Sequence, residues 1–382
     1  MADRAIIVSE NKLGNLRKQL QERGKRIVFT CGAYDLIHSG QTHFLAEART
    51  WGDVLVVGIS DDESRRALRG VGHPLIDEEG RAETLSALRP VDFVVPVNER
   101  ELFFALSALQ PDVFYTIGED WNCGIRSKDE QKLIKDFGGN VVKAERLEPF
   151  ISSSDIVEKI AQSTIRRNLK SFFGSDSFGQ NGESPPYLEL GRQYPRDLLS
   201  YAYLGEFVRW EELPSLRKKL KSRGKTISFV SGSYDLVHVG HVRFIEKAKS
   251  WGDLLVVGIP SDQAIRKLKG ASRPVVGESS RAELLRFFRA VDYITIFPQT
   301  TVEKTLELLK PDIFQTVEEG WNNGYKNSRE YKTVTAYGGE VKLVSRQAPY
   351  VSSHALINRA AGLRIKEIFK QCLDATKINN DR

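Results

Sequence analysis

The sequence has little cysteine and no long apolar segment. Its three cysteines, Cys31, Cys123 and Cys372, are too few for a disulfide framework or a thiolate metal cluster. No apolar run approaches the ~20 residues that span a bilayer. The first residues, MADRAIIVSENK, mix acidic and basic side chains without a long apolar stretch, so we expect no secretory signal. We therefore expect a cytoplasmic enzyme.

The chain is basic but lacks a concentrated basic patch. Its net charge is +6, and its sequence pI is about 9.0. The excess of positive charge fits either general solubility or an anionic ligand such as a nucleotide or a sugar phosphate. Lysine and arginine are dispersed, with no basic run interleaved with aromatic residues. We therefore expect small phosphorylated partners, and neither nucleic acid nor a membrane.

The sequence contains the same domain twice. Residues 15–160 and 215–360 align without a gap, and each carries one related phrase, CGAYDLIHSGQ at 31–41 and SGSYDLVHVGH at 231–241. A repeat of roughly 150 residues is too long for a solenoid unit, so we infer two whole domains in tandem. We place the first domain (copy one) at 1–165, a linker rich in Gly, Ser and Pro at 166–205, and the second domain (copy two) at 206–382. We expect the two copies either to pair within the chain or to belong to a homo-oligomer.

Each copy alternates buried-type strands with amphipathic helices. In copy two we expect strands at 226–232, 253–259, 292–297, 312–317 and 340–346, and helices that include 213–224, 238–252 and 281–291. This alternation predicts an α/β fold with two Rossmann-like, doubly wound parallel sheets, one per copy. Ligands of such sheets lie beyond the carboxyl ends of the strands. Neither first strand is followed by GxGxxG, which argues against a dinucleotide-dependent oxidoreductase.

The first strand-to-helix turn carries the residues suited to chemistry. His238 and His241 are three positions apart at a predicted helix start, so both can face one ligand. The free N–H groups of a helix N-terminus attract an anion, and Gly240 leaves room for a phosphate beside the backbone. Two donors at a helix N-terminus suit a phosphorus centre that gains charge in a transition state.

These motifs resemble a known family, the small nucleotidyltransferases. These include the cytidylyltransferases acting on glycerol 3-phosphate or ethanolamine phosphate, and the adenylyltransferases acting on heptose 1-phosphate. The similarity covers nearly all of each copy, including LKGASRPV at 268–275, the later Arg281 and ISSSDIV at 151–157. It implies that an alcohol phosphate or sugar phosphate attacks the α-phosphorus of an NTP in line and releases pyrophosphate. It also implies Mg²⁺ bound with the NTP. It does not decide whether the NTP is CTP or ATP, or which phosphate is the acceptor.

The resemblance also assigns residues to the site. It gives catalytic roles to His238, His241, Lys269, Arg281, His38 and Gln41. It gives nucleotide-binding roles to Gly232, Ser233, Tyr234, Asp235, Gly240, Ser352 and Ser353 in copy two, and to Gly32, Ala33, Tyr34, Asp35, Gly40, Arg81, Gly118, Asp120, Ser152, Ser153 and Ser154 in copy one. Simpler alternatives are a solvated surface lysine at 269, a surface ion pair at Arg281 and an ordinary helix cap at the serines. Asp235 would orient the turn or hold Mg²⁺ through water.

The two copies depart from the family pattern at different points. Copy one has Gln41, Arg69 and His73 where copy two has His241, Lys269 and Arg273, and copy two has Glu318 in place of Gly118. Three readings follow: copy two is the working transferase, both copies work, or neither does and the protein binds nucleotide as a regulatory or scaffolding module. We favour the first reading, because a charged histidine pair is harder to replace than a hydroxyl.

Overall fold

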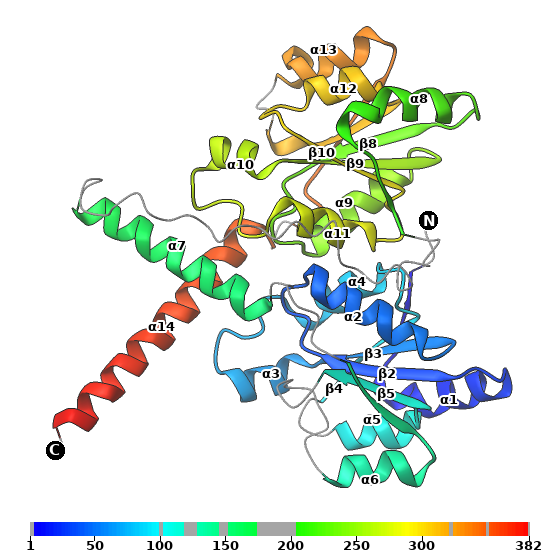
Figure 1. Cartoon of the computed structure of the whole chain (residues 1–382), viewed down its shortest axis with the longest axis vertical. Coiled ribbons are helices and arrows are strands. Elements are labelled where there is room, and N and C mark those ends of the chain that lie inside the picture. Colours follow the sequence, from blue (N-terminus) through cyan, green and yellow to red (C-terminus); the bar gives the residue numbers. More distant parts are fainter. Residues whose placement is uncertain are drawn as a thin grey trace.

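The computed structural model contains two parallel sheets with the same strand order. It describes residues 4–98, 102–117, 128–144, 152–173, 204–320, 324–348 and 351–380. In copy one the order is β1-β4-β3-β2-β5-β6, and in copy two it is β12-β11-β8-β9-β10-β7. Every pairing between these strands is parallel. The predicted pair of doubly wound α/β domains is thereby confirmed (Figure 1).

The elements of copy one follow the expected alternation. Its strands are β1 (Ile6–Ile7), β2 (Ile27–Gly32), β3 (Val54–Ser60), β4 (Phe93–Val97), β5 (Val113–Ile117) and β6 (Asn140–Ala144). Its helices are α1 (Leu13–Glu22), α2 (Ser39–Thr50), α3 (Asp62–Arg69), α4 (Glu78–Ser86), α5 (Leu102–Leu109), α6 (Lys128–Asp136) and α7 (Ser153–Phe173). The buried runs in β2 and β3 explain why these strands lie inside the sheet.

Copy two repeats this series. Its strands are β7 (Glu206–Phe207), β8 (Ile227–Ser231), β9 (Leu254–Pro260), β10 (Tyr293–Phe297), β11 (Ile313–Val317) and β12 (Glu340–Val344). Its helices are α8 (Leu213–Lys221), α9 (Val239–Lys249), α10 (Asp262–Lys269), α11 (Glu278–Arg286), α12 (Glu303–Leu309), α13 (Arg329–Ala336) and α14 (Ser353–Asn380). Helix α7 extends into the linker predicted at 166–205, and β7 begins directly after the predicted end of that linker.

The helix expected at 281–291 is shorter than predicted. Helix α11 ends at Arg286, and the next residues turn toward the other copy. Leu88 and Phe288 form an isolated antiparallel bridge, and Arg89 N donates to Phe287 O at 2.8 Å. In return, Arg289 N donates to Ala87 O at 2.9 Å. Because a buried phenylalanine pair fills this contact, tertiary packing outweighs the local helix preference.

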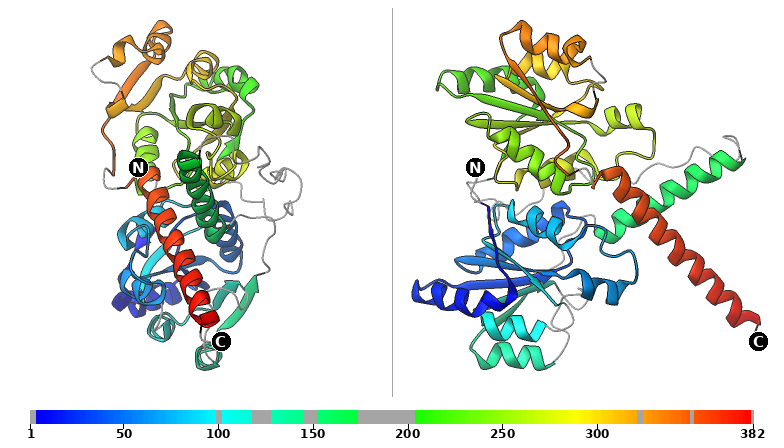
Figure 2. Two further views of the ribbon diagram at one scale, coloured as in Figure 1. Left: turned by 90° about the vertical axis from the view of Figure 1, so that its left-hand side faces the viewer. Right: turned by 180° about the vertical axis from the view of Figure 1, so that it is seen from behind.

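The two copies share a core and are related by a local two-fold axis. Position 88 meets position 288, and α4 packs on α9 as α11 packs on α2. One apolar cluster joins Leu45, Leu85 and Leu88 to Ile245, Leu285 and Phe288. Figure 2 shows the two sheets stacked about this contact, with α7 and α14 crossing to one side of both domains. The copies therefore form one folded unit, comparable to a symmetric dimer within a single chain.

Candidate functional site

Each copy places its HxGH or HxGQ turn at the carboxyl end of its central strand. In copy two, β8 ends at Ser231 and α9 begins at Val239, so His238 is the helix N-cap. In copy one, β2 leads in the same way to His38, the N-cap of α2. The strand order reverses beside β2 and beside β8, which is where doubly wound sheets bind ligands.

The hydrogen bonds of this turn determine which histidine nitrogens carry hydrogen. His238 Nδ1 accepts from Gly240 N at 3.2 Å, and His241 Nδ1 accepts from His238 N at 3.4 Å. A neutral imidazole that accepts at Nδ1 carries its hydrogen on Nε2. Both rings, 4.0 Å apart between centroids, therefore offer an Nε2–H donor to a ligand.

Gln41 reproduces this arrangement in copy one. Gln41 Oε1 accepts a hydrogen bond from His38 N at 3.3 Å, just as His241 Nδ1 accepts one from His238 N in copy two. The amide nitrogen, like Nε2–H, is then a donor. His38 Nδ1 accepts from Gln41 N at 3.4 Å. Gln41 is therefore a neutral analogue of a neutral histidine.

Burial disfavours the charged form of both histidines. Burial lowers the pKa of His238 to about 4. Burial, with smaller contributions from His238 and Lys269, holds the pKa of His241 well below its ordinary value. Burial therefore disfavours a positive charge on either ring at neutral pH, and Gln41 is uncharged at the matching position of copy one.

Cationic groups beside the turn distinguish the copies better. Lys269 Nζ donates to Ser233 Oγ at 2.8 Å, and the Arg273 guanidinium lies 3.0 Å from the Asp235 carboxylate. Partial burial, together with Arg273, lowers the pKa of Lys269. In copy one the corresponding residues are Arg69, Ala33 and His73; Ala33 has no hydroxyl, and His73 Nδ1 lies 4.0 Å from Asp35. Arg273 was noted in the sequence as part of the LKGASRPV phrase and as a difference between the copies, without a role of its own, and the structure places it beside Asp235.

Asp235 and Asp35 hold a loop in place. Asp235 Oδ1 accepts from the N–H groups of Val275 and Val276, both at 2.8 Å. Asp35 accepts from Leu75 N and Ile76 N in the same way. With two backbone donors and Arg273 around it, the buried Asp235 does not fit a direct metal ligand. Within the described part of the chain, no group of three or more His, Cys, Asp or Glu residues is arranged to hold a metal ion.

Arg281 is not a surface residue. Its side chain is fully buried, and its three nitrogens donate to Val276 O, Ser233 O, Pro260 O and the Asp262 carboxylate. Arg81 makes equivalent bonds to Ile76 O, Ala33 O and Asp62. This geometry is that of a positioning residue, which joins the turn after the first strand to α3 or α10. The acidic partners, Asp62 and Asp262, stand at equivalent positions in the two copies, a signal that sequence reasoning missed.

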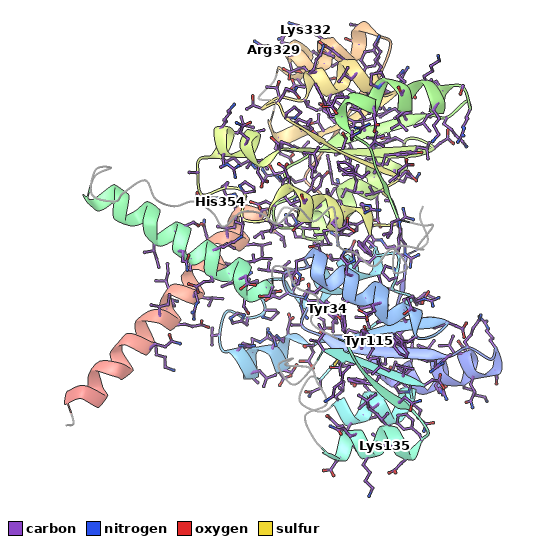
Figure 3. The ribbon with its side chains drawn as sticks, viewed as in Figure 1. Tyr34, Tyr115, Lys135, Arg329, Lys332 and His354 are labelled. Carbon is purple, nitrogen blue, oxygen red and sulfur yellow. The ribbon has the colours of Figure 1, made fainter. Side chains whose placement is uncertain are left out.

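The turn residues have packing roles as well. Tyr34 and Tyr234 adopt left-handed backbone angles, with φ of 49° and 47°, and their rings are buried. A Cβ at Gly232 would lie 3.0 Å from the Tyr234 ring, and one at Gly240 would lie 3.0 Å from the His238 ring. Figure 3 shows Tyr34 inside copy one and His354 at the start of α14. The remaining turn residues, Gly32 and Gly40, hold the matching positions in copy one.

The serine-rich starts of α7 and α14 approach the turn. Ser153 Oγ donates to Leu36 O, and Ser353 Oγ donates to Leu236 O, each at 3.1 Å. Ser352 Oγ accepts from Ala355 N at 3.1 Å, as a helix cap does, and Ser152 Oγ donates to Asp155 at 2.7 Å. Ser154 is exposed, and Gly118 and Asp120 lie outside the described residues. The serines are thus brought to the turn in both copies.

Asp155 introduces an acidic group that copy two lacks. Burial lowers the pKa of His38 to about 4, and the nearby Asp155 carboxylate opposes this shift. The matching residue of copy two is Ala355. At this position a negative charge is therefore present in copy one and absent from copy two.

Comparisons with known proteins agree with the geometry. The family described as "Cytidylyltransferase-like" matches residues 29–159 and 229–359. The chain is 41% identical over 135 residues to "Bifunctional protein HldE" of Geotalea uraniireducens, and 42% identical over 125 residues to that of Geobacter metallireducens. These matches cover 35% and 33% of this chain, but 27% and 25% of the relatives. The chain thus spans about a quarter of the length of these curated relatives.

A solved structure also matches one part of the chain. The lipopolysaccharide core biosynthesis protein of Thermoplasma volcanium is 27% identical, with a TM-score of 0.28, and covers 32% of this chain and 98% of its own. Among the helices of the described residues, none combines the length and apolarity needed to cross a membrane.

Proposed function

Because the chain belongs to the cytidylyltransferase-like family, we propose that it transfers a nucleotidyl group from an NTP to a sugar phosphate or alcohol phosphate and releases pyrophosphate. The observation that carries this proposal is the convergence of donors at one helix N-terminus. His238, His241 and Lys269 meet there, and the positive end of the α9 dipole lies at the same place.

We infer that copy two is the catalytic copy. Its turn combines the two Nε2–H donors with Lys269 and Arg273, whereas copy one has Gln41, Arg69 and His73 where copy two has His241, Lys269 and Arg273. Copy one also has Ala33 in place of Ser233 and Asp155 in place of Ala355. The turn and Lys269 would bind the α- and β-phosphates and neutralise charge that develops during in-line attack. The N–H groups and hydroxyls at Ser352 and Ser353 would bind the outer phosphates. Asp235 and Arg281 would position the loops around them.

Mg²⁺ would arrive with the NTP and be held through its phosphates, since Asp235 is occupied by protein groups. The carbonyl and N–H groups that would read the base are common to all residues, so CTP and ATP remain equal candidates. The acceptor candidates are heptose 1-phosphate, glycerol 3-phosphate and ethanolamine phosphate.

The test uses the full chain, because the copies share a core. Pyrophosphate release is measured with four NTPs and these three acceptors in the presence of Mg²⁺. His238→Asn should abolish most release, while His38→Asn should leave most of it. Reversal of these effects would assign catalysis to copy one. Nucleotide binding without release for any substrate pair would instead favour the regulatory or scaffolding alternative.

A further inference from the structure

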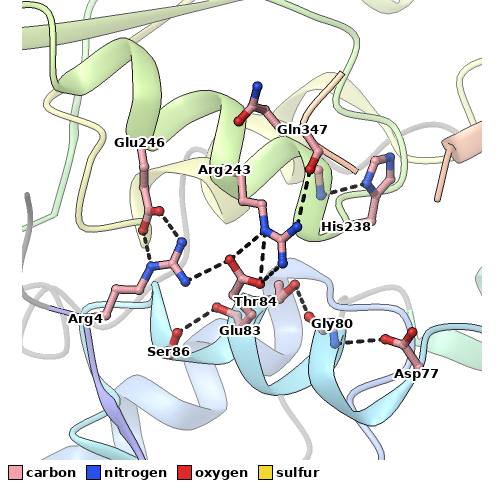
Figure 4. A network of polar contacts seen from close by, with 11 residues as sticks. Arg4, Asp77, Gly80, Glu83, Thr84, Ser86, His238, Arg243, Glu246 and Gln347 are labelled. Atoms are coloured by element: carbon pink, nitrogen blue, oxygen red, sulfur yellow. Dashed lines mark hydrogen bonds and ion pairs between the residues drawn. The ribbon is translucent and has the colours of Figure 1, made fainter. Parts of the chain in front are cut away.

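A carboxylate of copy one reaches the catalytic helix of copy two. Glu83, on α4, accepts from Arg243 Nε at 2.9 and 3.1 Å and from Arg4 Nη1 at 2.9 Å. The Glu83 side chain is 12% exposed. Burial alone would raise its pKa, but the hydrogen bonds from Arg243 and Arg4 outweigh burial and lower the pKa. Glu83 is therefore a charged group shared by two arginines at the domain interface (Figure 4).

Arg243 joins this carboxylate to the site. It lies on α9, two residues after His241, and its Nη1 donates to Gln347 O at 3.3 Å. The next residue, Ala348, packs against the turn, because a Cβ at Gly240 would lie 3.3 Å from its methyl group. Arg243 thus ties the helix of the HVGH turn to the segment that runs from β12 toward Ser352 and Ser353.

The same segment is fixed from its other side. Arg346 N donates to the Glu319 carboxylate at 2.7 Å, beyond the end of β11. Residues 345–348, which we name the β12 exit, are therefore held between η4 (Glu318–Gly320) and α9. Ser353 Oγ is also bonded to Leu236 O, so the β12 exit and the start of α14 both lie against the HVGH turn. A triphosphate that contacts the turn and the serines would need these segments held in place.

The symmetric position in copy one is built differently. There His43 Nε2 lies 3.1 Å from the Glu283 carboxylate of copy two. Imidazole offers one nitrogen to this carboxylate, whereas the Arg243 guanidinium contacts Glu83 and has a further nitrogen for Gln347 O. Glu283 also pairs with Arg286 of its own helix at 2.9 Å, so the two carboxylates differ in the group that reaches them from the other copy: His43 for Glu283 and Arg243 for Glu83.

We propose that Glu83 is a positioning residue for the copy-two site, supplied by copy one. It orients Arg243, which holds the HVGH turn and the β12 exit at the spacing that binds the triphosphate. Copy one then contributes to catalysis without reacting itself. This inference rests on the function proposed above, and it assigns to the first domain a role that its own turn does not require.

The test compares Glu83→Gln with a matched control, Glu246→Gln, in the full chain. Glu246 binds the same Arg4, at 2.7 Å from Nε, and makes no bond to Arg243 in the described structure. We expect Glu83→Gln to lower kcat/KM for the NTP by about tenfold to hundredfold, as misplacement of reacting groups does. It should also weaken pyrophosphate binding, measured by calorimetry, while Glu246→Gln changes neither.

A double-mutant cycle gives the decisive outcome. If Glu83 acts through Arg243, the pair Glu83→Gln and Arg243→Gln loses no more activity than Arg243→Gln alone. Additive losses, or wild-type kcat/KM and pyrophosphate affinity in a folded Glu83→Gln protein, would overturn the inference. Should Glu83→Gln not fold, Arg243→Lys replaces it, because lysine keeps the charge and loses the second contact. Absence of turnover in the wild-type chain would refute the proposed function, whereas the pyrophosphate affinities would still test Glu83.

Discussion

Lys269 donates a hydrogen bond to Ser233 at 2.8 Å, and the same two positions in copy one are Arg69 and Ala33. The hydroxyl holds the ammonium beside the HVGH turn, where its charge would face the phosphates of the proposed substrate. We expect Lys269→Ala to lower kcat/KM by about hundredfold, the usual effect of removing one group that stabilises a transition state. Pyrophosphate release measures the loss. Arg69→Ala is the matched control and should change release by less than about twofold.

The two histidines of copy two should each be required. His238→Ala or His241→Ala removes one Nε2–H donor, and we expect about a hundredfold to thousandfold loss of kcat. Circular dichroism checks that the fold is retained. The control, His38→Ala, should retain most activity. If a folded double variant of His238 and His241 releases pyrophosphate at the wild-type rate, the chemistry does not lie in copy two.

Acid should destabilise the protein in a defined pH window. The pKa of His38 and of His238 is about 4 in the folded chain against 6.5 for ordinary histidine. Between these values the unfolded chain binds more protons, so the free energy of unfolding falls as pH decreases from 6.5 to 4. The slope is at most about 1.4 kcal/mol per pH unit for each histidine. Above pH 6.5 neither state is protonated, and this stabilisation is complete.

His238→Asn tests this dependence. Asparagine caps a helix well and does not titrate. Thermal midpoints at pH 7.5, 6 and 5 should therefore decline less steeply in the variant than in the wild type. Equal slopes would show that His238 is protonated in the folded state as easily as in the unfolded state.

Removal of Arg281 should reduce stability more than any other single change near the site. Arg281→Met leaves the buried Asp262 carboxylate and three carbonyl groups without their donor. We expect a loss of about 3–5 kcal/mol in the free energy of unfolding, measured with denaturant. Lys269→Ala should leave stability nearly unchanged. A stable but inactive Arg281→Met protein would instead place this guanidinium in contact with the substrate.

Asp155, rather than Gln41, should limit copy one. Gln41 already presents a neutral donor, so Gln41→His should raise activity little in a chain whose copy two carries His238→Ala. Asp155→Ala in the same background removes the carboxylate near His38, and we expect tighter pyrophosphate binding in calorimetry. A large gain from Gln41→His, with none from Asp155→Ala, would identify Gln41 as the residue that limits copy one.

Much of this architecture could be predicted from local sequence. The strand–helix alternation and the ungapped repeat predicted both sheets, because these depend on hydrophobic patterns within one copy. The position of the HVGH turn followed from the same pattern. Helix α11 was extended too far, since Phe287 and Phe288 look helical alone but pack against the other copy.

Features that depend on distant partners were beyond local reasoning. Arg281 looks like a surface cation until Asp262, Ser233 and Val276 are placed around it. The acid near His38 comes from Asp155, far along the chain. The burial that lowers the pKa of His241 likewise cannot be read from the motif itself.

The joining of both copies in one chain affects how the interface can change and how it responds to dilution. In a dimer of identical chains, a substitution enters both halves at once, so Arg at one side of the axis requires Arg at the other. Here positions 43 and 243 mutate independently, which is why His43 and Arg243 can face Glu283 and Glu83. The association is also independent of concentration, because neither half can diffuse away from its partner. Activity per molecule should thus stay constant at dilutions where a two-chain assembly would separate.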